Sequence, residues 1–306
     1  MLSLWFGAYD QGLAYAGLAL GTLLTLRILN FADLTVDGSF ALGGGAAAVL
    51  LSQGVPLPLA LLAAVACGGL AGLVTALIHT RLGVNDLFAG ILTTTGLYSI
   101  TLRLMGRSNI PLSDLPGALA GLPDLGQGND GRWAIALTLV AAGLIALIAL
   151  VLATDLGLAL RAIGNNPVMA RANGVNQGRG LSVGLAAGNG LVALAGALVA
   201  LYQGFADVSM GIGSLILGLG MVIVGEAVLR PRSVPWSLLA VVVGAILFRL
   251  LIAIALQLGL EPVDLKLATA LLLLLALALG RLRLPGMATA GPRSGLASGP
   301  GPESGP

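Results

Sequence analysis

Charged residues are scarce in this chain, and their scarcity excludes a water-soluble domain. Only 9% of its 306 residues are Asp, Glu, Lys or Arg, whereas 57% are hydrophobic. A soluble protein carries roughly 25% charged residues to solvate its surface. The charges also leave long gaps, between Arg132 and Asp155, between Arg179 and Asp207, and between Asp207 and Glu226. Because about 20 apolar residues span a bilayer as a helix, we expect a polytopic membrane protein.

Cysteine, histidine and lysine are almost absent, which excludes several kinds of chemistry. Cys67 and His79 are alone in their types, so we expect neither a disulfide framework nor a metal site. The lysine Lys266 follows a leucine, so the phosphate-binding Gly-x-x-x-x-Gly-Lys-Ser/Thr loop is missing. No nucleophile elbow or His-Glu-x-x-His motif is present either. We therefore expect a chain that needs no cofactor, is not an enzyme and cannot itself hydrolyse ATP by a Walker-type mechanism.

Aromatic residues are few, at 4%, and period-two alternation is rare, which favours a helix bundle over a β-barrel. The predicted fold class is all-α, with eight or nine transmembrane helices. The candidate spans are the apolar runs 11–29, 39–52, 57–79, 87–105, 133–153, 181–201, 208–229, 236–258 and 265–280.

Two of these runs are short. The run 39–52 contains Gly43–Gly45 and suits a broken or re-entrant segment better than a full span. The run 265–280 can be extended if Lys266 snorkels. We assign residues 1–285 to a single transmembrane domain, which includes the 154–180 loop. Residues 286–306 are rich in Gly, Pro and Ser, which predicts a disordered cytoplasmic tail.

Arginines gather in the connections after residue 153, and this distribution predicts the orientation. The 154–180 loop, the 230–235 loop and the start of the tail all carry arginine, and cytoplasmic loops are enriched in Lys and Arg. We therefore place these three on the cytoplasmic side and residues 106–132 outside. The same distribution explains the charge asymmetry between the two halves of the chain, so no nucleic-acid partner is implied.

The 154–180 loop carries signals for a helix of its own. Asn166 is a good N-cap, Pro167 suits the first helical position, and Gly174 suits the left-handed position after a helix. They predict a helix over 167–173 outside the bilayer. Such a helix serves either to contact another protein or to rest on lipid headgroups, and the residues leave both readings open.

The stretch from Leu29 to Ser39 contains two acids, Asp33 and Asp37, between apolar runs. Like charges four residues apart destabilise a helix, and Gly38 follows directly. One interpretation is a broken helix that lines a substrate cavity, as half-helices do in transporters. The other is an ordinary loop with two solvated aspartates.

Polar residues inside the spans supply further candidates. The run Thr93-Thr94-Thr95 suits helix packing, while Tyr98 and one threonine can face a path. Glycines four residues apart, such as Gly68 and Gly72, allow helices to approach closely. Glu226 can pair with Arg230, and it is also a candidate partner for Arg249, the deepest charge.

Four stretches resemble the permease subunits of ATP-binding-cassette importers related to the branched-chain amino acid permeases. They are Asn30-Phe31-Ala32-Asp33 with Val36-Asp37-Gly38-Ser39, residues 86–106, residues 160–167, and residues 170–176. More narrowly, the chain is similar to the branch described as tryptophan/tyrosine transport permeases. The resemblance extends over residues 12–280, although the linker lacks the Glu-Ala-Ala form of other importer permeases.

This resemblance implies a bacterial inner-membrane permease with several partners. They are a cytoplasmic ATP-binding subunit, an extracytoplasmic substrate-binding lipoprotein and a second permease copy. The helix at 167–173 would be the coupling helix, and the implied ATPase contacts are Arg161, Asn165, Asn166, Arg171 and Gly174. The implied substrate path contains Asn30, Asp33, Thr35, Asp37, Ser39, Thr94 and Tyr98.

Two functions from different classes are consistent with these features. The first is the importer permease, which moves a small, amino-acid-like solute inward without covalent chemistry. The second is a secondary transporter coupled to protons or sodium through Asp33, Asp37 or Glu226, because intramembrane acids serve as proton relays. A purely structural membrane subunit is disfavoured by these acids and by Arg249.

Overall fold

The computed structural model describes residues 2–112 and 129–259, together with 261, 264, 267–271 and 273–274. Most of this part of the chain is helical. The elements in chain order are α1 (Leu2–Ala14), α2 (Ala16–Thr22), the π-helix η1 (Leu23–Ile28), α3 (Thr35–Ser52), α4 (Leu57–Leu82), α5 (Asp86–Met105), β1 (Asn109–Pro111), α6 (Asn129–Ala153), α7 (Asp155–Asn165), α8 (Pro167–Ala172), α9 (Gln177–Gln203), β2 (Phe205–Asp207), α10 (Ser214–Leu229) and α11 (Val234–Gln257).

Six of the described helices, α3, α4, α5, α6, α9 and α11, are long and apolar enough to cross a membrane. Two shorter apolar stretches, Ala16–Ile28 and Ser214–Leu229, correspond to the predicted runs 11–29 and 208–229. An all-α membrane protein is therefore confirmed. The run 265–280 and the tail 286–306 lie largely outside the described residues, so a total of eight or nine spans stays a prediction.

The expectation of a broken segment at 39–52 is wrong in its position. α3 is one continuous helix, and the glycine triplet lies inside it. Gly43 lets α3 touch α9, because a Cβ atom there would lie 2.1 Å from the carbonyl oxygen of Ala193. The break precedes α3 instead, at residues 29–34, where the chain leaves η1.

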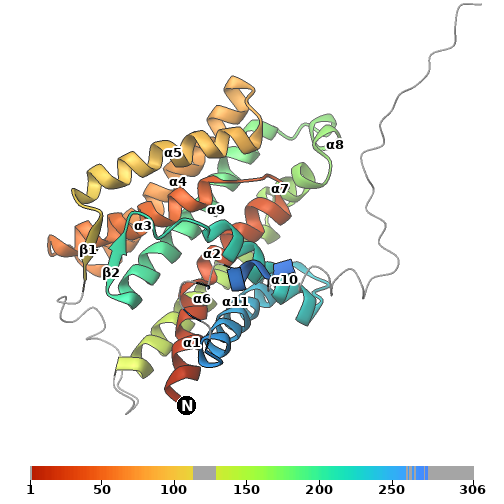
Figure 1. Cartoon of the computed structure of the whole chain (residues 1–306). Coiled ribbons are helices and arrows are strands. Elements are labelled where there is room, and N and C mark those ends of the chain that lie inside the picture. Colours follow the sequence, from red (N-terminus) through yellow and green to blue (C-terminus); the bar gives the residue numbers. More distant parts are fainter. Residues whose placement is uncertain are drawn as a thin grey trace, which may run out of the picture.

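One group of helices consists of α3, α4, α5 and α9, which pack against one another in the upper part of the molecule (Figure 1). α9 lies against both α3 and α4. At Gly72 of α4, an added Cβ atom would lie 2.2 Å from the carbonyl oxygen of Leu185. The close helix approach predicted from the Gly68/Gly72 spacing is therefore confirmed.

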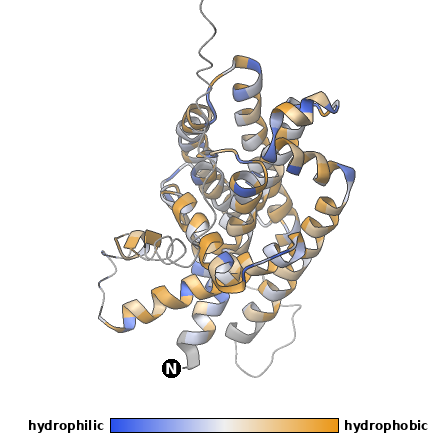
Figure 2. Cartoon of the chain, turned by 90° about the vertical axis from the view of Figure 1, so that its right-hand side faces the viewer, coloured by the Kyte–Doolittle hydropathy of each residue, from blue (hydrophilic) through white to orange (hydrophobic). Residues whose placement is uncertain are grey.

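The second group consists of α1, α6, α10 and α11, packed around α2. Its core contains large, fully buried side chains, among them Leu18, Met221, Leu238 and Phe248. Figure 2 shows that hydrophobic residues cover the long helices, while hydrophilic residues concentrate at their ends and in the turns. This distribution is the one expected of helices whose outer faces meet lipid.

A short β pair joins two distant segments, and no sequence signal predicted it. β1 runs antiparallel to β2, with Ile110 opposite Ala206. Each strand has three residues, too few for a period-two pattern to be read. The pair fixes the end of the α5 connection against the chain that leaves α9.

A hydrogen-bonded turn follows β2. Asp207 accepts hydrogen bonds from the hydroxyl and the backbone N–H of Ser209, and from the Asn109 side chain. The Ser209 hydroxyl is the main reason that the pKa of Asp207 lies below its ordinary value, because these donors stabilise the ionised carboxylate.

Candidate translocation and coupling sites

The helix break between η1 and α3 places an aspartate deep inside the bundle. η1 already departs from α-helical geometry, and Asn30 then adopts a left-handed backbone conformation with φ of 53°. The chain runs without helix through residues 30–33 before α3 begins. Asp33 is completely buried in this break, whereas Asn30 is exposed at the surface. The interpretation of Asp33 as a solvated loop residue is therefore wrong.

Hydrogen bonds from two elements, α3 and α9, hold the Asp33 carboxylate. The Asn189 side chain of α9 donates to one oxygen at 2.6 Å, and the Thr35 backbone N–H donates to the other at 2.9 Å. Asn189 in turn accepts a hydrogen bond from the Ser39 hydroxyl at 2.7 Å. A buried carboxylate needs such partners, because desolvation without compensation costs several kcal/mol. We call Asp33, Thr35, Ser39, Thr75 and Asn189 the polar seam.

The polar seam continues through two threonine hydroxyls. Thr35 and Thr75 lie 2.7 Å apart, oxygen to oxygen, and this contact joins α3 to α4. Both are fully buried. Thr75 and Asn189 were not among the predicted site residues. The sequence does contain an indication of Asn189, because it is a polar amide in the middle of the charge-free, apolar run of α9.

The threonine run of α5 divides between two roles. Thr93 and Thr95 donate to carbonyl groups of their own helix, at Ala89 and Ile91, as expected for threonines that only pack. Thr94 instead donates to the carbonyl oxygen of Leu34 at 2.7 Å and so satisfies the broken backbone.

Tyr98 lies on the outer face of α5 in this single chain, with 54% of its surface exposed. A path lined by Tyr98 would therefore run along the outside of α5 rather than through the polar seam.

Asp37 lies in the first turn of α3 and binds the start of α10. Its carboxylate accepts hydrogen bonds from the backbone N–H groups of Gly213 and Leu215, at 3.1 and 2.8 Å, and from the Ser214 hydroxyl at 2.9 Å. Unpaired N–H groups and a positive dipole end make a helix N-terminus a favourable place for a carboxylate. Asp33 and Asp37 therefore hold different parts of the bundle, although the sequence places them four residues apart.

The partners of Glu226 and Arg249 differ from those suggested by the sequence. Glu226 pairs with Arg27, with 3.2 Å between the carboxylate oxygen and the arginine Nε. Arg249 lies over the ring of Tyr15, with its guanidinium carbon 3.7 Å from the ring centre. The suggested pairing of Glu226 with Arg249 is therefore not found.

The 154–180 segment forms a helical hairpin at one edge of the molecule (Figure 1). The predicted helix is α8, capped by Asn166, whose side-chain oxygen accepts from the Met169 N–H at 3.0 Å. Gly174 follows with φ of 81°, as its assignment after a helix end requires. α7, which precedes α8, was not predicted.

The polar residues of the hairpin mostly stabilise it. Arg161 donates to the Leu152 and Gly157 carbonyl groups, at 3.1 and 3.3 Å, and so fastens α7 to the end of α6. Arg171 donates to the side-chain oxygen Oε1 of Gln177, and the side-chain amide of Gln177 donates to the backbone carbonyl of Pro167 at 2.6 Å. Arg171, like Asn165, is exposed at the surface.

Apolar side chains dominate the outer surface of the hairpin. Val168 and Met169 of α8 are 77% and 63% exposed. A groove of about 430 Å³ runs between α7 and α8. Its lining residues are Asp155, Leu158, Ala159, Ala162, Asn165, Asn166, Met169, Ala170, Asn173 and Val175. A surface of this composition fits a protein partner better than a small polar ligand.

The inner face of α7 touches the helix break. Leu160 packs in one buried cluster with Leu29 and Phe31, which lie in the helix break. At Gly164 the two backbones approach so closely that a Cβ atom would lie 1.9 Å from the carbonyl oxygen of Ile28. α7 therefore packs directly against the segment that holds Asp33.

The described residues form a helical membrane protein with a buried polar seam, a broken helix and a projecting hairpin. Comparison with known families gives its class: residues 7–278 match the family described as branched-chain amino acid transport system / permease component. The chain belongs to this family of transport permeases, which are not enzymes.

Two curated relatives cover nearly the whole chain. A protein of Clostridioides difficile (strain R20291), described as a tyrosine transport system permease protein, is 38% identical over 274 residues, which are 90% of each chain. An uncharacterized protein of Rickettsia prowazekii (strain Madrid E) is 32% identical over 266 residues, 85% of this chain and 91% of the relative. No solved structure matches.

Proposed function

We propose that this chain is the permease subunit of an ATP-driven importer in the bacterial inner membrane, and that it transports an aromatic amino acid of the tyrosine type. The class of solute is suggested by the Clostridioides difficile relative, which is described as a tyrosine transport permease. The energy source is suggested by the family. Since this chain has no Walker motif, ATP would be hydrolysed by a separate subunit.

The single observation that carries the proposal is the contact between α7 and the helix break. A partner seated in the α7–α8 groove would push on Leu160 and Gly164, which lie directly against residues 28–31. Packed interfaces of this kind switch between discrete arrangements rather than deforming continuously. ATP-driven movement of the hairpin would thus rearrange the polar seam and change the accessibility of the path.

On this proposal the cytoplasmic ATPase covers Val168 and Met169, an extracytoplasmic lipoprotein delivers the solute near β1 and β2, and a second permease copy completes the path. The exposed apolar face of α5, which includes Tyr98, supports contact with a second copy or with membrane lipid. Residues 1–285 then form the permease domain and the tail 286–306 remains cytoplasmic.

The test is affinity purification of the tagged permease from solubilised membranes, followed by ATPase and uptake assays. We expect an ATP-hydrolysing subunit to co-purify with the wild-type chain. The double variant Val168→Glu and Met169→Glu should lose this subunit and the uptake of labelled L-tyrosine.

A matched control is Leu258→Glu, which makes the same change at an 83% exposed leucine after α11, outside the hairpin. It should retain the ATPase. Transport by the purified chain alone in liposomes, without ATP, would overturn the proposal in favour of a secondary transporter.

A further inference from the structure

A small cavity between α1, α9 and α11 is lined by one cationic side chain, that of Arg249, and by no acidic residue. The cavity measures about 90 Å³ and is lined by Gln11, Ala14, Tyr15, Val199, Tyr202, Gln203 and Arg249. None of these lining residues is an acid. Asp10, on the same helix as Gln11, is buried but does not line the cavity.

Arg249 is presented to the cavity in a fixed orientation. One face of its guanidinium lies on the ring of Tyr15, and that ring is itself stacked on Phe40 with 5.6 Å between the centres. The Nε atom of Arg249 is buried and has no hydrogen-bond partner among the residues that the structure describes. A buried N–H without a hydrogen-bond partner is unfavourable, so this group is poised to bind an acceptor.

The polar groups of the cavity suit a small anion such as a carboxylate. Guanidinium N–H groups form a planar fork that matches the two oxygens of a carboxylate. The amides of Gln11 and Gln203 add further hydrogen-bonding groups on the walls. Pockets that enclose a whole ligand measure roughly 300–1,000 Å³, and this cavity is much smaller. It can therefore hold the carboxylate group of an amino acid but not an entire aromatic amino acid.

The position of the cavity agrees with entry from the outer side. Gln203 ends α9, and its side chain donates to the carbonyl oxygen of Phe205, the first residue of β2. Arg249 lies eight residues before the end of α11 at Gln257, or roughly 12 Å along the axis. The cavity therefore lies close to the β1–β2 end, where the proposed function places solute delivery.

We propose that Arg249 and the surrounding cavity bind the carboxylate group of the transported solute as it enters the bundle. The inference deepens the proposed function and rests on it for the identity of the solute. The polar seam would then be reached after this first contact.

The test is thermal unfolding of the full-length permease in lipid nanodiscs with a panel of probes. The panel contains L-tyrosine, L-leucine, acetate, 3-(4-hydroxyphenyl)propionate, tyramine and inorganic phosphate. A ligand that binds the folded state raises Tm by mass action. We expect the carboxylates to raise Tm in the wild-type chain, and tyramine, which lacks a carboxylate, to have no effect.

The variants separate binding from folding, because the readout is the ligand-dependent change in Tm and not Tm itself. Arg249→Gln should abolish the change, and Arg249→Lys should retain part of it. Equal shifts in the wild type and Arg249→Gln, or no shift with any carboxylate, would overturn the inference. A shift with phosphate as large as that with the carboxylates would also overturn it, since it would indicate a lipid headgroup.

The outcomes also distinguish this inference from the proposed function. If acetate and L-leucine raise Tm through Arg249 but L-tyrosine neither binds nor is transported, the site stands and the proposed solute is wrong. If ATP-driven uptake of L-tyrosine is the same in the wild type and Arg249→Gln, the importer stands and the carboxylate site is wrong.

Discussion

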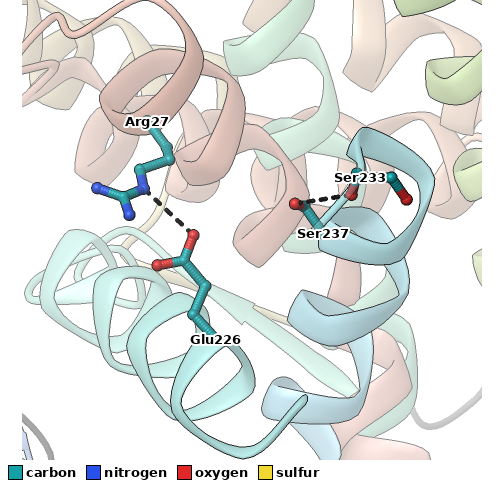
Figure 3. Close-up of polar contacts among 4 residues, drawn as sticks. All are labelled: Arg27, Glu226, Ser233 and Ser237. Atoms are coloured by element: carbon teal, nitrogen blue, oxygen red, sulfur yellow. Dashed lines mark hydrogen bonds and ion pairs between the residues drawn. The ribbon is translucent and has the colours of Figure 1, made fainter. Parts of the chain in front are cut away.

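Arg27 and Glu226 are joined across 199 positions of sequence by an ion pair of 3.2 Å, which connects the π-helix η1 to the last turn of α10 (Figure 3). The arginine side chain is 68% exposed and the glutamate 25% exposed. The pair therefore ties the broken segment to α10 at the border of the bundle, immediately before the chain enters the break.

Charge exchange tests this pair. Arg27→Glu should lower Tm because it places two carboxylates together, and the double variant Arg27→Glu with Glu226→Arg should recover most of the loss. Since Arg27 is largely exposed, we expect a coupling energy of only about 0.2–1 kcal/mol. The measurement is a double-mutant cycle by thermal unfolding at low salt. Additive effects of the two changes would show that the pair contributes nothing to stability.

The polar seam yields a second prediction, on stability. Asp33→Asn should lower the free energy of unfolding by about 1–3 kcal/mol, because its new amide group would meet the Asn189 amide donor or the Thr35 N–H. The double variant Asp33→Asn with Asn189→Asp again pairs an amide donor with a carboxylate acceptor, with the two groups exchanged. It should recover part of the lost free energy of unfolding. Denaturation of the two variants in the same detergent measures this. A double variant no more stable than the sum of its single changes would contradict the hydrogen-bonded arrangement.

Asp37 should matter for transport more than for assembly. Asp37→Ala removes the three hydrogen bonds that the start of α10 donates to this carboxylate. The loss of such a cap lowers the free energy of unfolding by about 1–2 kcal/mol. We expect slower uptake by the assembled transporter and an unchanged amount of protein in the membrane. Ser214→Ala, which removes one of the three contacts, is the milder control. Wild-type uptake in Asp37→Ala would limit Asp37 to a local structural role.

Two helical glycines provide a matched test of coupling. An added Cβ atom at Gly164 would lie 1.9 Å from the Ile28 carbonyl oxygen, whereas one at Gly143 would meet nothing within 4 Å. Alanine is favoured over glycine in a helix by about 1 kcal/mol, so Gly143→Ala should be neutral or stabilising. Gly164→Ala should separate α7 from the break and reduce solute-stimulated ATPase activity of the assembled complex. Equal activity in both variants would contradict transmission through this contact.

The turn after β2 predicts a pH dependence. Because the Ser209 hydroxyl and N–H hold the pKa of Asp207 below its ordinary value, the ionised carboxylate stabilises the folded state. This contribution is complete above about pH 4, the ordinary value for Asp, and is lost as the pH falls through the lower folded value. Ser209→Ala should raise the pKa of Asp207 and so begin this loss at a higher pH. Tm measured against pH in the two proteins tests the shift, and superimposable curves would refute it.

Several features could be read from local sequence because local physics determines them. The α8 hairpin turn is an example, since Asn166, Pro167 and Gly174 each act on the backbone next to them. The sequence around Asp33 and Asp37 also predicted the break before α3. The glycine triplet Gly43–Gly45 predicted a second break, but it lies within the continuous helix α3. Those glycines serve close packing against α9, which is a tertiary requirement that resembles a helix breaker in sequence.

The partners of the polar residues could not be read in the same way. Asn189 lies 156 positions from Asp33, and Thr75 lies 40 positions from Thr35. No local pattern encodes these contacts, because they arise only when α3, α4 and α9 pack together. The suggested pairing of Glu226 with Arg230 or Arg249 is wrong for the same reason. The partner of Glu226 is Arg27, which lies on a different helix and cannot be identified from the spacing of charges along α10.

The sequence by itself determined that this chain is a helical membrane protein of the permease family, because charge, hydropathy and local motifs are properties of short segments. The tertiary structure decided which charges are buried, which are paired and which side chains share a cavity. Burial and pairing depend on helices that meet across the bundle, and so Arg249 and Tyr15, 234 positions apart, come into contact only in the folded chain.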